Sequence, residues 1–253
     1  ADASAVSGLM DTIAASYTES SDGWTVMDMA VYAGLPGKTA KTSETAWQNA
    51  LNLLVSEAGS SSASAGDRAR LEIVLRAMGV DSTQLYPANS NSRIDNAQKL
   101  AGMQLISGGY YAAPWILLAA RQGNVVLSKT QINGLLELLS ANVGEGLFGY
   151  TWQGAAYSDP DTAGAALAAL AEYVEEYETA RELIEKIRAA VPAAFSETGS
   201  LGSANSDAMM ILGLLALGED PADYCSADSG ASLVDGLLSY VNPETDRFQF
   251  EGD

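Results

Sequence analysis

Apolar residues recur along this chain mainly with the three-to-four-residue period of α-helices. The period predicts helices at roughly 4–18, 23–34, 43–57, 65–79, 94–105, 111–122, 129–141, 160–175, 179–191, 206–217 and 230–240. Only the stretches around Phe148–Tyr150 and Phe248–Phe250 are expected to form short extended pieces. The pattern therefore predicts an all-α protein.

The helix start at Asp159-Pro160-Asp161 is the most sharply marked in the sequence. Asp159 suits the N-cap, Pro160 suits the first helical position, and Asp161 then lies in the first turn, where the helix dipole favours a negative charge. Asn205 is expected to cap a later helix in the same way. After Pro160, one helical face is apolar and the opposite face carries small residues, namely Gly164, Ala165, Ala168 and Ala169. Such a helix is expected to be packed on both sides within a multi-helix assembly.

Similar segments recur at intervals of about 45 residues, which is the length of two helices and two connections. The residues that close them are Gly34, Gly79, Gly123, Tyr173 and Gly218. The predicted helical-hairpin repeats lie near 4–34, 43–79, 94–123, 129–173 and 179–218, with a partial repeat at 230–253. Ala- and Leu-rich helices alternate with amphipathic ones, as in 179–191. This alternation predicts inner and outer helix rings, an α/α toroid formed by a single domain, 1–253.

Charge and cysteine content narrow the function classes. The chain has a net charge of -19, and residues 127–253 hold 21 acidic against 5 basic residues. Nucleic acid is not expected as a partner, because its binding requires lysine and arginine to neutralise phosphates. The acidic half is either a solvated surface or a site for a cation or basic partner. Without histidine, and with only Cys225, the chain offers neither a disulfide framework nor the ligands of a closed zinc site. No apolar run is long enough for a membrane span.

The residues from Ser158 to Tyr173 resemble the Asp-Pro-Asp-(Met)-Thr-Ala…Ala-Leu-x-Ala-Leu-Ala-x-Tyr signature of prenyltransferase/squalene-cyclase-type repeats. The nearest likeness is to repeat domains of Gram-positive bacterial surface proteins, which are related to the cobalamin carriers transcobalamin and intrinsic factor. Segments that begin at Trp24, Asp67 and Ser206 are similar to other repeats of that group, and the likeness covers about residues 20–250. The resemblance implies an α/α toroid, with the last repeat cut short at Asp253. It also implies a secreted or cell-surface bacterial location.

The enzyme classes of this superfamily each require particular residues. Its prenyltransferases bind zinc through aspartate, cysteine and histidine, but this chain has no histidine, and Cys225 has no thiol or imidazole partner. Terpene cyclases need an aspartic acid as proton donor, and Pro160 occupies that position. A carbohydrate-active α/α-barrel enzyme would need a pair of carboxylates. The aspartates near inner-helix starts are Asp28, Asp67, Asp159, Asp161 and Asp207. Capping and first-turn placement explain them without catalysis.

The remaining feature is an aromatic, glycine-rich loop, 144–157, immediately before Asp159. We expect this loop at the mouth of the toroid, where its aromatics either bind a ring-shaped ligand or seal the barrel. The expected ligand-binding residues are Trp24, Asp28, Tyr110, Trp115, Tyr150, Trp152, Asp159, Asp161 and Asp207. Helix dipoles are expected to lower the pKa values of these carboxylates.

The sequence thus favours a non-catalytic binding module with no cofactor and no metal. A terpene cyclase- or prenyltransferase-like enzyme, or a carbohydrate-active α/α-barrel enzyme, is the alternative. The family resemblance indicates a corrinoid such as cobalamin as the ligand. The cobalamin carriers close over their ligand with a β-rich domain that has no counterpart in these residues. A surface glycan, or another protein, therefore stays open as the ligand.

Overall fold

The computed structural model describes residues 3–249, and 57% of the chain is helical, in 11 α-helices. The prediction of a mainly α-helical protein is therefore confirmed. The described chain divides into two compact units. The N-terminal unit contains residues 3–108 and Leu118–Ser128, and the C-terminal unit contains Gly109–Leu117 and residues 129–249. The boundary falls inside helix α6 (Ala113–Gln122), whose two halves belong to different units. The single-domain toroid stays a prediction.

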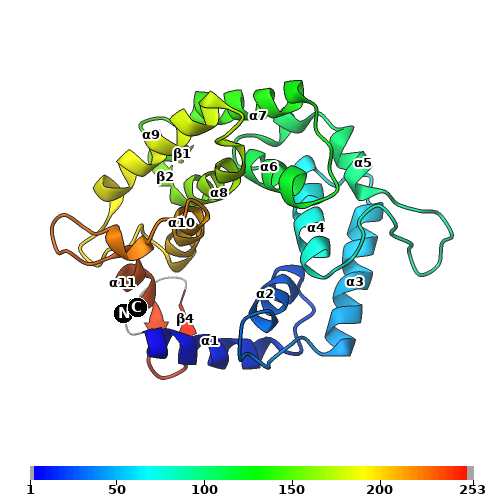
Figure 1. The fold of residues 1–253 in the computed structure, drawn as a ribbon, viewed down its shortest axis with the longest axis horizontal. Coiled ribbons are helices and arrows are strands. Elements are labelled where there is room, and N and C mark those ends of the chain that lie inside the picture. Colours follow the sequence, from blue (N-terminus) through cyan, green and yellow to red (C-terminus); the bar gives the residue numbers. More distant parts are fainter. Residues whose placement is uncertain (1–2, 250–253) are drawn as a thin grey trace. The chain divides into compact units, whose positions relative to one another are not determined.

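Within the described residues, the N-terminal unit contains five complete α-helices, one short 3-10 helix and the second half of α6 (Figure 1). The complete elements are α1 (Ala3–Tyr17), α2 (Gly23–Ala33), α3 (Glu44–Gly59), α4 (Ala65–Ala77), α5 (Asn96–Ala101) and η1 (Leu105–Gly108). Helix α4 packs against α2, α3 and α5. The apolar core consists of Leu54, Val55, Ala58, Leu71, Val74, Leu75, Leu85 and Ile94. The helix predicted at 94–105 is shorter in the structure: α5 covers only Asn96–Ala101, Gly102 is its C-cap, and the separate 3-10 helix η1 begins at Leu105.

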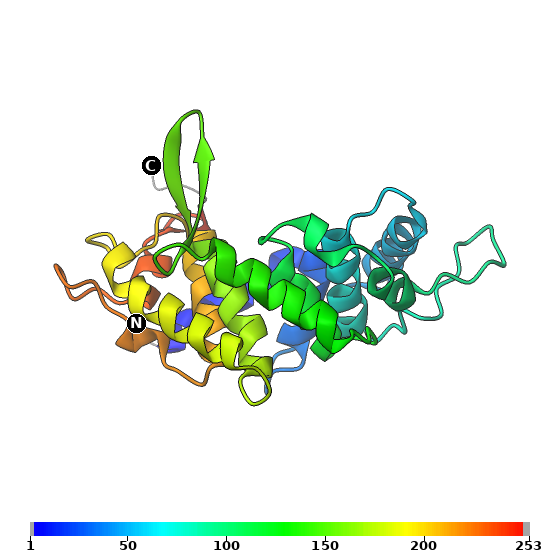
Figure 2. The same ribbon diagram turned by 90° about the horizontal axis from the view of Figure 1, so that it is seen from above.

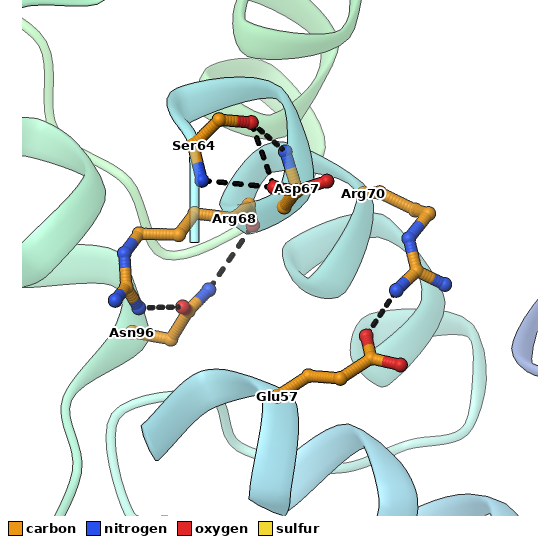
Figure 3. Close-up of polar contacts among 6 residues, drawn as sticks. All are labelled: Glu57, Ser64, Asp67, Arg68, Arg70 and Asn96. Carbon is orange, nitrogen blue, oxygen red and sulfur yellow. Dashed lines mark hydrogen bonds and ion pairs between the residues drawn. The ribbon is translucent and has the colours of Figure 1, made fainter. Parts of the chain in front are cut away.

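Helix α4 also carries two buried charged residues, Arg68 and Glu72, on successive turns; Figure 3 shows Arg68. Asn96 of α5 connects them: its side-chain oxygen accepts from Arg68 Nη1 at 2.9 Å, and its Nδ2 donates to Glu72 Oε1 at 2.6 Å. Arg68 also donates to the carbonyls of Ala58 and Ser60. These bonds offset the cost of removing both charges from water.

The C-terminal unit contains the remaining elements. They are α7 (Lys129–Asn142), β1 (Phe148–Trp152), β2 (Ala155–Asp159), α8 (Pro160–Leu170), η2 (Ala171–Tyr173), α9 (Glu178–Ala194), α10 (Ala204–Ala216), η3 (Pro221–Asp223), α11 (Leu233–Leu238), β3 (Val241–Asn242) and β4 (Arg247–Phe248). Strands β1 and β2 form an antiparallel hairpin, and so do β3 and β4. Residues 250–253 of the predicted partial repeat lie outside the described residues. The sequence anticipated β1 and β4 but missed their partners β2 and β3.

Helices α8 and α10 pack directly against each other, and α9 packs against both α8 and α7. The contact between α8 and α10 depends on two glycines. A Cβ at Gly164 would lie 2.3 Å from the carbonyl oxygen of Met209, and one at Gly213 would lie 2.5 Å from the carbonyl oxygen of Gly164. The predicted close approach at the small face of α8 is therefore confirmed at Gly164. At the other end of α8, the buried Tyr173 hydroxyl donates to the Leu117 carbonyl at 2.9 Å.

Candidate functional site

The β1–β2 hairpin presents an aromatic face to solvent, and in Figure 2 this green hairpin projects beyond the neighbouring helices. Side chains alternate along a strand, so Phe148, Tyr150 and Trp152 share one face of β1. Tyr157 of β2 pairs with Tyr150, and their rings stack with centroids 5.4 Å apart. Tyr150, Trp152 and Tyr157 are 51%, 62% and 47% exposed. In this structure their rings face solvent and do not seal a core.

The base of the hairpin is held by Tyr110. Its ring stacks on the fully buried Phe148 with centroids 5.3 Å apart and an interplanar angle of 7°. Its hydroxyl donates to the carbonyl oxygen of Gly149 at 3.2 Å. Burial, followed by the nearby Asp159 carboxylate, raises the pKa of Tyr110, so this hydroxyl stays protonated near neutral pH. Tyr110 therefore fixes the hairpin to its own unit.

A two-residue turn closes the hairpin between Trp152 and Ala155. Both turn residues have positive φ, 49° at Gln153 and 85° at Gly154, as two-residue hairpin turns of this hand require. The turn brings Tyr157 opposite Tyr150 and places Trp152 beside the tip. The register of the aromatic face is thus set by the turn.

Asp159 ends β2 and is the N-cap of α8; the sequence predicted the cap but not the strand. Its carboxylate accepts from the Thr162 backbone N–H at 3.0 Å and from the Thr162 hydroxyl at 2.8 Å. Pro160 follows as the first helical residue and is buried. The capping prediction is confirmed, and it accounts for Asp159 without any catalytic role.

Asp161 links the starts of two helices. Its Oδ1 accepts from the Ser206 hydroxyl of α10 at 2.6 Å, and its Oδ2 accepts from Asn205 Nδ2. The prediction that Asn205 caps α10 is wrong. Ser203 is the cap, because its hydroxyl accepts from the Ser206 backbone N–H. With the cap two residues earlier, Asn205 lies within the first turn and its amide reaches across to α8.

Asp207 is fully buried in the first turn of α10. Its Oδ1 accepts from the Leu201 backbone N–H at 2.6 Å, and its Oδ2 is the buried side-chain oxygen left without a hydrogen bond in the described part of the chain. Burial raises the pKa of Asp207, and the charge of Asp161 raises it further, against the lowering effect of Leu201 and Ser200. The prediction of a lowered pKa is wrong here, because desolvation outweighs the helix dipole.

The other predicted residues belong to helices α6 and α2. Trp115 is half-buried in the first turn of α6. Trp24 and Asp28 belong to α2 in the N-terminal unit, where Trp24 packs against the apolar core. Asp28 is solvent-accessible, yet partial desolvation and then the Asp22 carboxylate raise its pKa, again opposite to expectation. We therefore define the hairpin site by Tyr110, Phe148, Tyr150, Trp152, Tyr157, Asp159 and Asp161.

Phe148 and Tyr157 lie in the predicted aromatic loop but were not among the named ligand-binding residues, and the contacts of Asn205 and Ser206 with Asp161 were not predicted from the sequence. A usable signal was present in the repeat period. Asp161 and Ser206 are 45 residues apart and are hydrogen-bonded. The 45-residue spacing therefore corresponds here to a direct contact between the starts of α8 and α10.

Two structural features were searched for in the described residues: clusters of metal-ligating side chains and membrane-spanning helices. No group of three or more Asp, Glu or Cys side chains within residues 3–249 is arranged to hold a metal ion. Over the same residues, no helix has the length and apolar character to cross a membrane. Comparisons of the chain with protein-family models, curated proteins and solved structures gave no match.

Proposed function

We propose that this chain is a binding module of a secreted or cell-surface bacterial protein, and that it holds its ligand at the hairpin site without chemical turnover. The observation that carries the proposal is the row of exposed rings, Tyr150, Trp152 and Tyr157, fixed at its base by the Tyr110–Phe148 stack. Exposed aromatic side chains of this kind supply large contact area at a low entropic cost.

The polar groups beside the hairpin favour a ligand with hydrogen-bond donors. Asp159 and Asp161 both hold their carboxylates at the start of α8, next to the strand that carries Tyr157. A flat or ring-shaped molecule would stack on the aromatic face and donate hydroxyl or amide hydrogens to these oxygens. A corrinoid, whose rim carries amide groups, is our first candidate. A surface glycan or a protein segment is the alternative with the same chemistry.

We further propose that the helical hairpins of both units belong to one α/α toroid, with the hairpin site at its mouth. The support comes from contacts between helices of like type. The Ala- and Leu-rich α8 and α10 pack against each other, the amphipathic α9 packs against α7, and α2 packs against α4. Such contacts between successive repeats are the pattern of a helical solenoid.

The test is a binding panel with purified protein, using cobalamin and a set of oligosaccharides, with tryptophan fluorescence or calorimetry as readout. We expect saturable binding of one compound, weakened about tenfold or more by Trp152→Ala, because an aromatic anchor that a ligand covers contributes about 2 kcal/mol or more. Tyr86→Ala is the matched control, since Tyr86 is a 53% exposed aromatic residue of the N-terminal unit. Equal weakening by both variants, or no effect of Trp152→Ala, would contradict the assignment.

The enzymatic alternatives are separated by a turnover assay on the same preparation. Squalene, prenyl diphosphates and the oligosaccharides are incubated with wild type and with Asp161→Asn, and products are followed by mass spectrometry. We expect no product from either protein. Product formed by the wild type and lost in Asp161→Asn would replace the binding-module proposal with a catalytic one.

A further inference from the structure

A pocket of about 240 Å³ lies in the N-terminal unit, separate in residues from the hairpin site. Its lining is Glu72, Arg76, Gly79, Val80, Asp81, Ser82, Gly123 and Asn124. The volume equals about eight water molecules at about 30 Å³ each. It therefore suits a small polar molecule and is too large for one bare ion.

The floor of the pocket is a buried carboxylate held by three donors. Glu72 is 1% exposed, and its Oε2 accepts from the Ser82 hydroxyl at 2.6 Å. Asn96 Nδ2 bonds Oε1, and the backbone N–H of Asn124 also donates to this carboxylate. Gly123 allows the close approach of the loop, because a Cβ there would lie 2.6 Å from the Ala119 carbonyl oxygen and 3.3 Å from Glu72 Oε2. The carboxylate is thus fixed in position before any ligand arrives.

The rim of the pocket carries two opposite charges, both exposed. Asp81 Oδ1 accepts from the backbone and hydroxyl of Thr83, which lower its pKa, so the group is ionised near neutral pH. Its Oδ2 forms no hydrogen bond with another described residue and is open to a ligand. Arg76 forms no ion pair among the described side chains, so its guanidinium is likewise open.

Helix ends add to the electrostatics. Helix α4 ends at Ala77, two residues before the lining residue Gly79, and α6 ends at Gln122, directly before the lining residue Gly123. A helix C-terminus carries a partial negative charge, which favours a cationic group nearby. The Glu72 and Asp81 side of the pocket therefore attracts a cation, while Arg76 attracts an anion. A metal ion alone would satisfy the first side and be repelled by the second.

We propose that this pocket binds a small zwitterion of the α-amino acid class, with its ammonium toward Glu72 and Asp81 and its carboxylate on Arg76. The pocket is lined mainly by polar and charged groups, so a short polar side chain fits best. The proposal does not depend on the hairpin site or on the function proposed for it.

The test is titration of the whole 253-residue chain, followed by calorimetry and by amide NMR shifts, with glycine, L-serine and L-asparagine. We expect saturable binding of at least one. N-acetyl-L-serine lacks the ammonium group and L-serinamide lacks the carboxylate. Each should bind about tenfold more weakly or worse than L-serine, a loss of about 1.4 kcal/mol. Inorganic phosphate and calcium chloride are the ion controls.

The variants Arg76→Gln and Asp81→Asn should each weaken binding about tenfold, because each removes one charged partner. Both side chains are exposed, so folding should be retained, and thermal unfolding checks this. Arg70→Gln is the matched control, since Arg70 lies on the same helix but pairs with Glu57 and does not line the pocket (Figure 3).

Three outcomes would overturn the assignment. The first is that none of the three amino acids saturates at millimolar concentration. The second is that the two derivatives bind as well as L-serine, or that only phosphate or calcium binds. The third is that Arg70→Gln weakens binding as much as Arg76→Gln does.

Discussion

Two helix contacts, one in each unit, bring neighbouring helices together in different ways: one through buried polar side chains and the other through glycine backbones. In the N-terminal unit, α4 buries Arg68 and Glu72 and joins α5 through Asn96. In the C-terminal unit, α8 meets α10 through the backbones of Gly164 and Gly213. The polar contact needs every donor matched to an acceptor, whereas the backbone contact needs the absence of side-chain atoms. The first arrangement leaves room for a pocket beside Glu72, and the second leaves no room at its contact.

The two contacts also treat their buried carboxylates differently. Glu72 accepts from Ser82, Asn96 and Asn124, whereas Asp207 accepts from Leu201 through one oxygen and leaves the other without a bond. Burial raises the pKa of both groups. Hydrogen bonds from three residues thus offset the desolvation of Glu72, whereas the desolvation of Asp207 is offset through one of its two oxygens.

The largest expected effect is that of Glu72→Ala. We expect the free energy of unfolding to fall by about 3–5 kcal/mol, because Ser82, Asn96 and Asn124 lose their acceptor and a cavity remains. Asp207→Ala should cost less, about 1–2 kcal/mol, since it leaves only the Leu201 N–H without its acceptor. Chemical denaturation of both variants measures the difference. An equal or larger loss for Asp207→Ala would break the distinction between the two carboxylates.

The next effect concerns the backbone contact. Gly164→Ala should lower the free energy of unfolding by about 1–3 kcal/mol, because its Cβ would overlap the Met209 carbonyl. Gly8→Ala in α1 is the matched control, since no neighbouring atom lies within 4 Å of the added Cβ. That control should gain about 0.5–1 kcal/mol from helix propensity. A gain at both positions would show that α8 and α10 are not in backbone contact.

A smaller, pH-dependent effect is expected for Asp207→Asn. Burial raises the pKa of Asp207 above its unfolded value of 3.8, so the folded protein binds this proton more tightly than the unfolded chain. The ionised group therefore costs stability at neutral pH, and the cost disappears as pH falls below 3.8. The stability of Asp207→Asn relative to the wild type should therefore be greater at neutral pH than in acid. Chemical denaturation near pH 4 and near pH 7 tests this.

Asp67→Asn is the control, because the pKa of Asp67 is shifted in the opposite direction to that of Asp207. Hydrogen bonds from the Ser64 backbone and hydroxyl lower the pKa of Asp67 below 3.8 (Figure 3). Its stabilisation is present above pH 3.8 and is lost as pH falls through the lower, folded pKa. The wild type should therefore have a larger free energy of unfolding than this variant at neutral pH, and the difference should disappear in acid. The same pH trend for both variants would contradict the burial argument for Asp207.

The smallest effect on stability is expected at the hairpin. Trp152 is 62% exposed, so Trp152→Ala should change the free energy of unfolding by no more than about 0.5 kcal/mol. The same variant is expected to weaken ligand binding, which separates function from folding at this residue. A loss of several degrees in the thermal midpoint would indicate that the ring is packed in the folded protein, contrary to its exposure.

Local sequence determined the helices, because their signals lie within a few residues of each other. The 3.6-residue period placed the eleven α-helices of the described chain, and Asp159 with Pro160 set the start of α8 correctly. The small face around Gly164 indicated a close neighbour, since a missing side chain is informative without knowledge of the partner. The 45-residue spacing between Asp161 and Ser206 was visible in the sequence, but their hydrogen bond was not predicted from it.

Tertiary structure alone decided which groups are desolvated and which partners they find. The sequence placed Asp207 at a helix start, where a lowered pKa was expected, but burial raised it. Ser82, Asn96 and Asn124 are far from Glu72 along the chain, and only folding gathers them around its carboxylate. Likewise, the turn at Gln153 and Gly154 made a projecting hairpin from a predicted loop. Helix signals act over one or two turns, whereas desolvation and pocket formation depend on residues brought together from distant positions.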